Sequence, residues 1–285
     1  MDLSIIMINY NAKELTAKAI QSIYDTKPQI SFEIIVVDNS SDETQVYRNK
    51  SLKANSVIRV ENKGFGNACN IGAANARGQY ILFLNNDTLM HERTLDTCVR
   101  YLQHHPHVGV LSARILLENG LLDHACKRGF PTPISSLYYF CGLDKRFPKS
   151  KKYGAYRQTF IEVDSISEVD SVAGSFLMMP NTVFEKVDGY DETFFMYGED
   201  LDLCFRVKNN GFSVVYYGPV CITHLKGQSG LHTKSPLVTY HFYNAMLLFY
   251  KKHYLKKYNW LTTIAVYLGI KTKYALAVLK IRLDK

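Results

Sequence analysis

A short apolar run that ends abruptly in polar residues constrains this chain most. Residues 80–84 read Tyr-Ile-Leu-Phe-Leu, and Asn85, Asn86 and Asp87 follow directly. An uninterrupted run of this kind predicts a short strand buried on both faces, as in parallel sheets. Ligands of open α/β sheets bind outside the carboxyl ends of strands, so Asp87 is a candidate ligand contact. The same polar residues could instead form a turn that caps the next helix.

Strands and helices alternate on both sides of this run. The predicted strands cover residues 3–8, 33–38, 57–60, 80–84, 108–113, 169–179, 214–217 and 220–223, and the predicted helices cover 12–24, 65–77, 93–104 and a segment after Gly198. This alternation predicts an α/β fold with a mostly parallel, doubly wound sheet flanked by helices. Residues 116–168 show little periodicity, and such a segment inside a compact domain is usually functional or disordered.

The positive charge is confined to one end of the chain. The 285 residues carry 34 Lys or Arg and 26 Asp or Glu, for a formal net charge of +8. Residues 236–285 contain nine of the basic residues and a single acid, which accounts for the whole excess. The body of the protein therefore has no basic surface of the kind that binds a polynucleotide, and we predict no nucleic-acid partner.

The cysteines and the N-terminus bear on the compartment. Six cysteines are scattered along the chain without a Cys-x-x-Cys pair, which argues against a zinc site and against a disulfide framework. This pattern predicts a reducing compartment. The apolar run at residues 3–8 is too short for an export signal and has no basic residue before it. We therefore expect a cytoplasmic protein.

Two enzyme classes fit the sequence poorly. A dinucleotide-binding fold needs glycines in the first strand–helix turn, and here that turn is Asn9-Tyr10-Asn11. Glu199 and Asp200 could form the acid pair of a glycoside hydrolase, but adjacent helical residues point about 100° apart and cannot straddle one glycosidic bond. These two acids could also simply complement a helix N-terminus.

The chain resembles the inverting family-2 glycosyltransferases of the GT-A fold, and within them the rhamnosyltransferase-like branch. The resemblance rests on an ordered set of short motifs over roughly residues 3–230. The motifs are Asn9-Tyr10-Asn11, Val37-Asp38-Asn39-Ser40, residues 62–72, Leu84-Asn85-Asn86-Asp87, Phe195–Arg206 with Glu199-Asp200, His224 and Ser229. One departure is that the usual Asp-x-Asp is Asn85-Asn86-Asp87, which leaves a single carboxylate for a metal ion.

The resemblance assigns roles to residues of this sequence. It implies a divalent cation, Mg²⁺ or Mn²⁺, held by Asp87 and His224, and a general base at Asp200, with Glu199 as the alternative. The acceptor side would include Arg128, Gly174, Ser175 and Tyr197. The residues implied to bind the nucleotide-sugar donor are Asn9, Tyr10, Asn11, Asp38, Asn62, Gly64, Asn70, Asn85 and Asn86.

The implied reaction is transfer of a sugar from a nucleoside-diphosphate sugar to a hydroxyl group, with inversion. The sugar would be a hexose or deoxyhexose such as rhamnose, and the acceptor a glycan or polyprenyl-linked glycan in surface polysaccharide synthesis. Two alternatives stay open. One is a non-catalytic homologue that binds sugar nucleotides, and the other is a nucleotidyltransferase on a similar sheet.

We predict a catalytic domain at residues 1–235 and a basic helical tail at 236–285. Within the domain, residues 1–115 would bind the nucleotide sugar and 116–235 the acceptor. In the second helix of the tail, Leu261, Ile264, Ala265, Leu268, Leu276, Leu279 and Leu283 share one face, with basic residues on both borders. Such a helix fits the inner, anionic surface of a cell membrane, but it also fits a dimer interface or a core helix.

Overall fold

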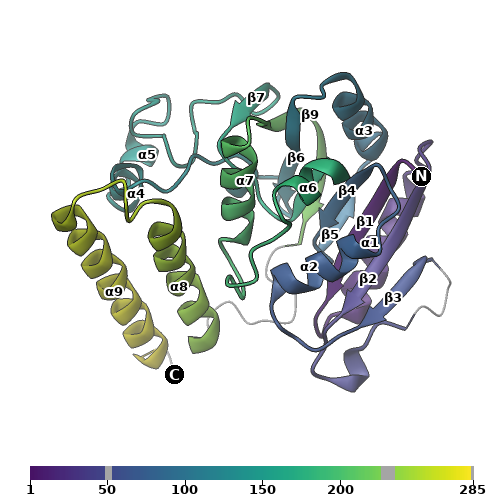
Figure 1. The fold of residues 1–285 in the computed structure, drawn as a ribbon, viewed down its shortest axis with the longest axis horizontal. Helices are drawn as coiled ribbons and strands as arrows, with labels where there is room; N and C mark the ends of the chain where they lie inside the picture. The colour runs from purple at the N-terminus through teal and green to yellow at the C-terminus, as the bar shows by residue number, and fades with distance from the viewer. Residues whose placement is uncertain (49–52, 226–234, 284–285) are drawn as a thin grey trace.

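The computed structural model describes residues 1–48, 53–225 and 235–283, and a mixed sheet runs through its centre (Figure 1). The strand order is β3-β2-β1-β4-β8-β6-β9-β5, and β7 adds to β9. The strands are β1 (Leu3–Asn9), β2 (Phe32–Asp38), β3 (Ser56–Arg59), β4 (Tyr80–Leu84), β5 (Thr88–Met90), β6 (Val108–Leu117), β7 (Ile166–Val169), β8 (Phe176–Pro180) and β9 (Ser213–His224).

Helices flank this sheet and extend beyond it. They are α1 (Lys13–Asp25), α2 (Phe65–Ala74), α3 (Thr94–His104), α4 (Pro133–Phe140), α5 (Leu143–Arg146), α6 (Asn181–Lys186), α7 (Glu199–Asn209), α8 (Pro236–His253) and α9 (Trp260–Leu283). Two short 3₁₀ turns, η1 (Glu43–Gln45) and η2 (His124–Cys126), lie in the loops. The predicted run at residues 80–84 is β4, and its four residues from Ile81 to Leu84 are buried.

The sheet is more mixed than the sequence predicted. The pairs β3·β2, β2·β1, β1·β4 and β6·β9 are parallel, and this part of the prediction is confirmed. The strand β8 runs antiparallel to both β4 and β6, and β5 and β7 run antiparallel to β9. The chain reaches β8 through the long segment after β6 rather than through a short crossover helix, so the parallel direction is not imposed.

Three predicted boundaries were wrong. Residues 214–217 and 220–223 belong to one strand, β9, which follows β6 with a register shift between Ala113 and Arg114. The predicted strand at 169–179 is interrupted, because Ser171 turns aside to exchange backbone hydrogen bonds with Arg128. The helix α2 ends at Ala74 rather than at residue 77.

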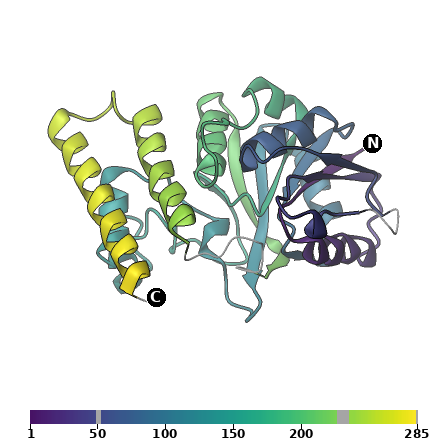
Figure 2. The same cartoon turned by 90° about the horizontal axis from the view of Figure 1, so that it is seen from below.

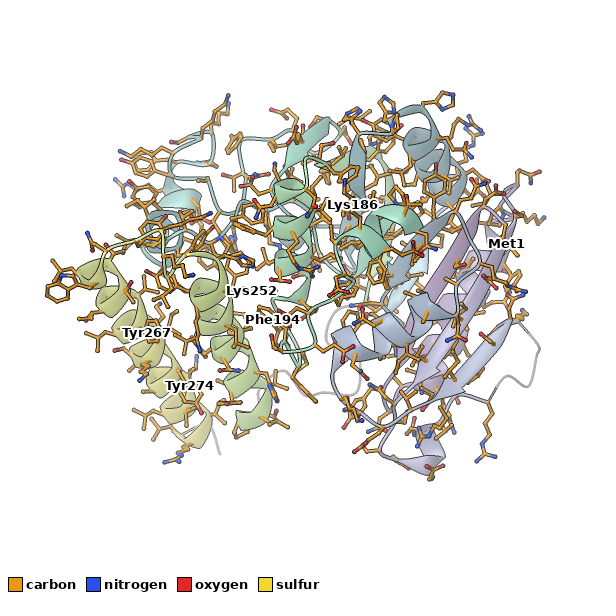
Figure 3. All side chains as sticks on the ribbon, viewed as in Figure 1. Met1, Lys186, Phe194, Lys252, Tyr267 and Tyr274 are labelled. Atoms are coloured by element: carbon orange, nitrogen blue, oxygen red, sulfur yellow. The ribbon has the colours of Figure 1, made fainter. Side chains whose placement is uncertain are left out.

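A second apolar cluster joins α8 to α7, outside the sheet. Its buried members are Phe194, Leu201, Phe205, Ala245, Phe249, Tyr250 and Tyr254. Lys252 lies over the Phe194 ring at 5.9 Å, and Figure 3 shows the two side chains between the helices. Asp202 on α7 also contacts Lys252 at 2.7 Å and His253 at 2.7 Å. Thus α8 packs on the body of the protein, although the sequence placed it in a separate tail.

The last helix is attached differently. In Figures 1 and 2, α9 lies beside α8 on the side away from the sheet. It contacts α8 through Tyr267 and Tyr274, whose rings pack on Tyr250 and Tyr243, and it contains no buried residue. Within the described ranges, no helix combines the length and apolar character that crossing a membrane requires.

Candidate active site

The carboxyl ends of β1, β2 and β4 meet at one edge of the sheet. Parallel pairing sets Asn9 beside Asp38 and Met7 beside Leu84. The polar residues that follow these strands therefore come together, as expected from the strand ends. This edge carries the N-terminal set of predicted donor-binding residues.

The side chains of Asn9 and Asp38 form their hydrogen bonds within the protein. Both side chains are buried. The Asn9 amide donates to Asp38 Oδ2 at 2.5 Å and to Ser40 Oγ at 2.9 Å, and Tyr47 N donates to Asp38 Oδ2 at 2.7 Å. Asp38 Oδ1 accepts from Ser40 N and pairs with the Arg59 guanidinium. These hydrogen bonds fix the side chains at the ends of β1 and β2. Both oxygens of the Asp38 carboxylate accept hydrogen bonds from the protein.

Tyr10 and Asn11 directly follow β1, and both residues are partly exposed. Asn11 adopts a left-handed conformation with φ +50°, and its amide donates to Ser41 Oγ at 2.9 Å. Asp42 N donates back to Asn11 Oδ1 at 3.0 Å, and the Tyr10 hydroxyl lies 3.3 Å from Ser41 Oγ. Hydrogen bonds therefore hold this turn in one conformation, while the side chains of Tyr10 and Asn11 stay partly exposed to a ligand.

The loop before α2 joins the N-terminal part of the sheet to the segment that precedes α7. Gly64 has φ +104°, and a Cβ there would lie 2.6 Å from the Phe195 carbonyl oxygen, so only glycine fits. Asn62 Oδ1 accepts from Gly64 N at 3.1 Å. Asn70 holds the same segment, because its side chain bonds both the N–H and the carbonyl of Tyr190. Asn70 thus connects protein segments, a role the sequence did not reveal.

Asp87 and His224, which are far apart in the sequence, meet at the end of β4. The pairing of β5 with β9 aligns Thr88 with His224, and Leu225 N donates to the Asp87 carbonyl at 2.7 Å. The His224 Nε2 atom lies 3.0 Å from Asp87 Oδ1, and Nδ1 lies 3.5 Å from Asp123 Oδ2. No motif had singled out Asp123, which comes from the irregular segment after β6.

The two carboxylates govern the protonation of His224. Burial alone would lower the pKa of this imidazole, but the contacts with Asp123 and Asp87 raise that pKa to about 9. The ring is therefore cationic at neutral pH in this arrangement. It would have to give up that proton to bind a metal ion.

Asn85 and Asn86 connect this centre to its neighbours. Asn86 is buried, and its amide donates to Thr16 Oγ1 at 3.2 Å. Asn85 N donates to the Ser175 carbonyl at 3.2 Å. Ser175 is buried as well, and within residues 1–48, 53–225 and 235–283 its hydroxyl has no hydrogen-bond partner.

Asp200 stands in the first turn of α7 and is fixed by three donors. Its Oδ2 accepts from Arg128 Nη2 at 2.7 Å and from Gly174 N at 3.0 Å, and its Oδ1 accepts from Leu201 N at 2.7 Å. The loop of Gly174 and Ser175 therefore reaches Asp200 on one side and Asn85 on the other. Through this loop, Asp200 and the Asp87–His224 pair belong to one connected edge.

Glu199 faces the interior instead. It is buried, and burial together with the neighbouring Asp200 charge raises the pKa of its carboxyl group to about 8. Its Oε2 atom is buried and has no hydrogen-bond partner among the described residues. Of the two acids, Asp200 is the one bonded to the loop that leads to Asp87.

The two remaining predicted acceptor residues have different surroundings. Arg128 donates to both Asp200 and the Val172 carbonyl, and its side chain is largely buried. Tyr197 is exposed, has φ +69°, and packs edge-on against Phe242 of α8 at 5.7 Å.

Asp202 and Arg206, predicted to be an ion pair, do form one at 2.7 Å. The predicted Ser229 lies outside the described residues.

Comparison with known families assigns the chain. The family model described as glycosyl transferase family 2 matches residues 4–158, more than half of the chain. The protein belongs to glycosyl transferase family 2. A second model, described as the N-terminal domain of galactosyltransferase, matches residues 157–226 and so covers the region of Asp200 and His224.

Several curated proteins are similar to this family-2 chain. The rhamnosyltransferase WbbL of Escherichia coli K12 is 31% identical over 162 residues, which cover 54% of this chain and 57% of WbbL. The hexosyltransferase Agl10 of Haloferax volcanii, named for low-salt glycan biosynthesis, is 26% identical over 75% of this chain and 64% of its own length. The N-acetylglucosaminyl-diphospho-decaprenol L-rhamnosyltransferase of Mycobacterium tuberculosis is 28% identical over 57% of this chain and 52% of its own length. The chain thus spans less than two thirds of each of these relatives.

Solved structures support the fold. Residues 1–349 of S. aureus TarS, in complex with UDP-GlcNAc, align with a TM-score of 0.55 at 20% identity, over 87% of this chain and 65% of that one. GalNAc-T7 with UDP, GalNAc and Mn²⁺ aligns with a TM-score of 0.57 at 15% identity, over 78% of this chain and 43% of its own. The predicted GT-A fold of this family-2 protein is confirmed.

The donor set at Asp87 and His224 suits a divalent cation in part. Asp87 Oδ1 is buried, and the His224 Nε2 atom lies 3.0 Å away. No cluster of three or more His, Cys, Asp or Glu in the described part of the chain is arranged to hold a metal ion. Mg²⁺ is usually bound through one or two carboxylates, with phosphate oxygens and water in the remaining positions, and Asp87 supplies one carboxylate.

Proposed function

We propose that this protein is an inverting glycosyltransferase that moves a sugar from a nucleoside-diphosphate sugar to a hydroxyl of a glycan or lipid-linked glycan. The observation that carries the proposal is the 172–175 loop, which bonds the Asp200 carboxylate on one side and the Asn85 backbone on the other. A general base and a diphosphate-binding centre are thereby held on one edge. Family membership supports the same reaction.

Asp200 is the proposed general base. Its carboxylate removes the proton of the acceptor hydroxyl while that oxygen attacks the anomeric carbon, and the nucleoside diphosphate leaves from the opposite face. The bonds from Arg128 and Gly174 N hold the carboxylate in one orientation, which favours in-line attack. We therefore assign Arg128 a positioning role rather than direct acceptor binding, because its guanidinium is already engaged.

Asp87 and His224 are the proposed residues at the diphosphate. A divalent cation there, when bound, would neutralise the negative charge that grows on the leaving group. The buried Asp87 Oδ1 offers the oxygen ligand and His224 the nitrogen ligand. Both ring nitrogens of the protonated His224 face carboxylates, so a bound cation would have to replace the proton on Nε2. The donor would then lie at the end of β4.

The donor and acceptor are proposed from the relatives. WbbL and the mycobacterial protein are named as rhamnosyltransferases, and the mycobacterial name specifies a decaprenyl-linked acceptor. We infer that a deoxyhexose such as rhamnose and a polyprenyl-linked glycan are the first substrates to examine here. The assembled product would be a surface polysaccharide.

Product analysis tests the reaction class. The protein is incubated with a panel of nucleoside-diphosphate sugars and an isolated polyprenyl-linked glycan, and the released species is identified by mass spectrometry. Glycosyl transfer releases a nucleoside diphosphate and adds one sugar to the acceptor. Release of inorganic diphosphate would instead reveal a nucleotidyltransferase. Binding without any product would indicate a non-catalytic homologue, and either result would overturn the proposal.

We also propose that α9 rests on an anionic membrane surface, at the cytoplasmic face. The half-buried residues of α9, such as Tyr267 and Tyr274, face α8, and a second apolar face is left exposed. The exposed residues are Leu261, Ile264, Leu268, Leu276, Leu279 and Leu283. Basic residues border this face, and the positive excess of the whole chain resides in this region, which matches anionic lipid headgroups.

Vesicle sedimentation separates a membrane from a second subunit as the partner of this face. We expect the full chain to sediment with phosphatidylglycerol-containing vesicles and much less with pure phosphatidylcholine. The double substitution Ile264→Glu and Leu268→Glu should abolish sedimentation, whereas Thr262→Glu on the flank should not. A concentration-dependent dimer in the absence of lipid, lost in the double variant, would instead make the face a subunit interface.

A further inference from the structure

A second polar cluster lies on β5 and β9, away from the proposed active site. His91 follows β5, and its Nδ1 lies 3.4 Å from Cys221 Sγ on β9. The other ring nitrogen, Nε2, lies 2.9 Å from Thr223 Oγ1. A thiol, an imidazole and a hydroxyl are thus joined in series across two paired strands.

This cluster opens into a pocket of about 910 Å³. Cys221, His91 and Thr223 all line it, together with residues of α1 and α3. Side chains alternate along a strand, so Cys221 and Thr223 face the pocket while His224 lies on the opposite face of β9. The burial pattern agrees, since Cys221 and Thr223 are half-buried and His224 is buried. The pocket is therefore separate from the Asp87–His224 centre.

The geometry matches that of an activated nucleophile. In one tautomer of His91, Nε2–H donates to Thr223 Oγ1, and Nδ1 accepts the proton of the Cys221 thiol. A nucleophile within reach of a base, with the base oriented by a third group, is the general arrangement of nucleophilic catalysis. The backbone fixes this arrangement as well, because Thr94 Oγ1 donates to the Cys221 carbonyl at 2.9 Å.

We infer that Cys221 is a reactive thiol and a site of covalent modification by small carbon electrophiles, with His91 as its base. With an α-halo amide, the sulfur forms a bond to carbon, the carbon–halogen bond breaks and the halide leaves with the electron pair. The thiol proton passes to His91 Nδ1. The pocket admits a small polar reagent, since Asp25, Glu92 and Arg93 line it beside the cluster.

The chain supplies its own reference thiol. Cys141, at the end of α4, is exposed, whereas Cys221 is only half-buried and the other four cysteines are buried. If access alone set the rate, Cys141 would be alkylated first. Activation by His91 reverses this order, so the order of modification distinguishes the two explanations without any substitution.

Pulse alkylation with iodoacetamide tests the inference on the folded full chain. Peptide mass spectrometry follows each cysteine separately at neutral pH, and we expect Cys221 to react about tenfold faster than Cys141. His91→Gln should reduce the rate at Cys221 by about tenfold and leave Cys141 unchanged. Thr223→Val should give a smaller reduction at Cys221, because the base loses its orienting partner. The control His104→Gln, on exposed α3 surface, should change neither rate.

Two results would overturn the inference. One is a Cys221 rate equal to or below that of Cys141 in the unsubstituted protein. The other is an unchanged Cys221 rate in His91→Gln, with the far-ultraviolet circular dichroism of the variant matching that of the parent. Because the readout is thiol chemistry, these outcomes do not depend on the proposed sugar transfer.

Discussion

The two parts of the sheet edge differ in how their polar groups are satisfied. On the β1–β2 side, Asn9 and Asp38 bond to each other and to the loops around them. On the β4–β8 side, Asp87 Oδ1 pairs with His224 Nε2 at 3.0 Å, and the buried Ser175 hydroxyl lacks a hydrogen-bond partner within the described residues. Both sides were predicted to bind ligand, and each leaves one buried side-chain atom without a partner among the described residues, Asn39 Oδ1 and the Ser175 hydroxyl, but the Asp38 carboxylate is fully engaged by protein donors.

This difference distinguishes residues that hold the structure of the site from residues that have a polar atom available to a ligand. Buried polar groups in native proteins are normally hydrogen-bonded, so unsatisfied ones indicate where a partner belongs. Substitutions on the β1–β2 side should therefore act on stability first. Substitutions on the β4–β8 side and at Asp200 should act on activity first.

The largest effect is expected at Asp200. Asp200→Asn removes the proposed base but keeps the size of the side chain, and the transfer rate should fall by about 10²- to 10⁴-fold. The largely buried Arg128 guanidinium loses its charged partner, so thermal unfolding should also shift to lower temperature, and the rates are compared between folded proteins. The matched control Glu185→Gln, an exposed acid on α6, should leave the transfer rate at the parental value. A transfer rate for Asp200→Asn within a factor of two of the parent would exclude Asp200 as the base.

Asp38→Ala tests the β1–β2 side of the sheet edge, where the polar side chains bond to one another and to nearby loops. The change leaves the Tyr47 N–H without its acceptor and removes one of the acceptors of Asn9 and of Arg59, and the free energy of unfolding should drop by about 3–5 kcal/mol. Urea denaturation measures this directly. Asp42→Ala, which removes an exposed cap of the short turn η1, should cost much less. Equal costs for the two variants would remove the contrast.

The interface between α7 and α8 should make stability depend on pH. Burial alone would raise the pKa of Asp202, but His253, Arg206 and Lys252 lower it to about 2, from an ordinary value of 3.8. A carboxyl group whose pKa is lower in the folded state stabilises the protein above the unfolded pKa. About 2 kcal/mol should therefore be present above pH 4 and lost as the pH falls toward 2. Asp202→Asn should flatten this part of the stability curve measured by urea denaturation.

Ser175→Ala should have the smallest effect on stability. The hydroxyl has no partner among the described residues, so its removal should change the free energy of unfolding by less than about 1 kcal/mol. The KM for donor or acceptor should nevertheless rise if this hydroxyl binds substrate. A loss of stability comparable to that of Asp38→Ala would show that Ser175 belongs to the structural side of the comparison.

Much of this arrangement could be predicted from the sequence. The run at residues 80–84 identified the central strand, because a strand buried on both faces needs an unbroken apolar sequence. The order of the motifs led us to expect Asp87, Asp200 and His224 at one edge. The structure brings Asp87 beside His224 and links Asp200 to Asn85 through the 172–175 loop. Local patterns and motif order were sufficient for these features.

Features that depend on long-range partners could not be predicted. Nothing near Asp38 reveals that Asn9 and Arg59 will satisfy its carboxylate, and nothing near Arg128 reveals its bond to Asp200. The sequence identified the exposed apolar face of α9, but it did not reveal that the opposite face packs on α8. The antiparallel pairing of β8 with β4 and β6 could not be predicted, because an apolar run carries no information on strand direction.

The most direct test of the account is whether nucleoside diphosphate binds at Asp87. Isothermal titration of a nucleoside diphosphate, with Mg²⁺ or Mn²⁺ and again with chelator, should be compared for the parent protein and for Asp87→Asn. We predict binding by the parent and an increase in Kd of about tenfold or more, which corresponds to about 1.4 kcal/mol, for the variant. An Asp87→Asn protein that stays folded and binds the nucleotide as tightly as the parent would contradict the central claim.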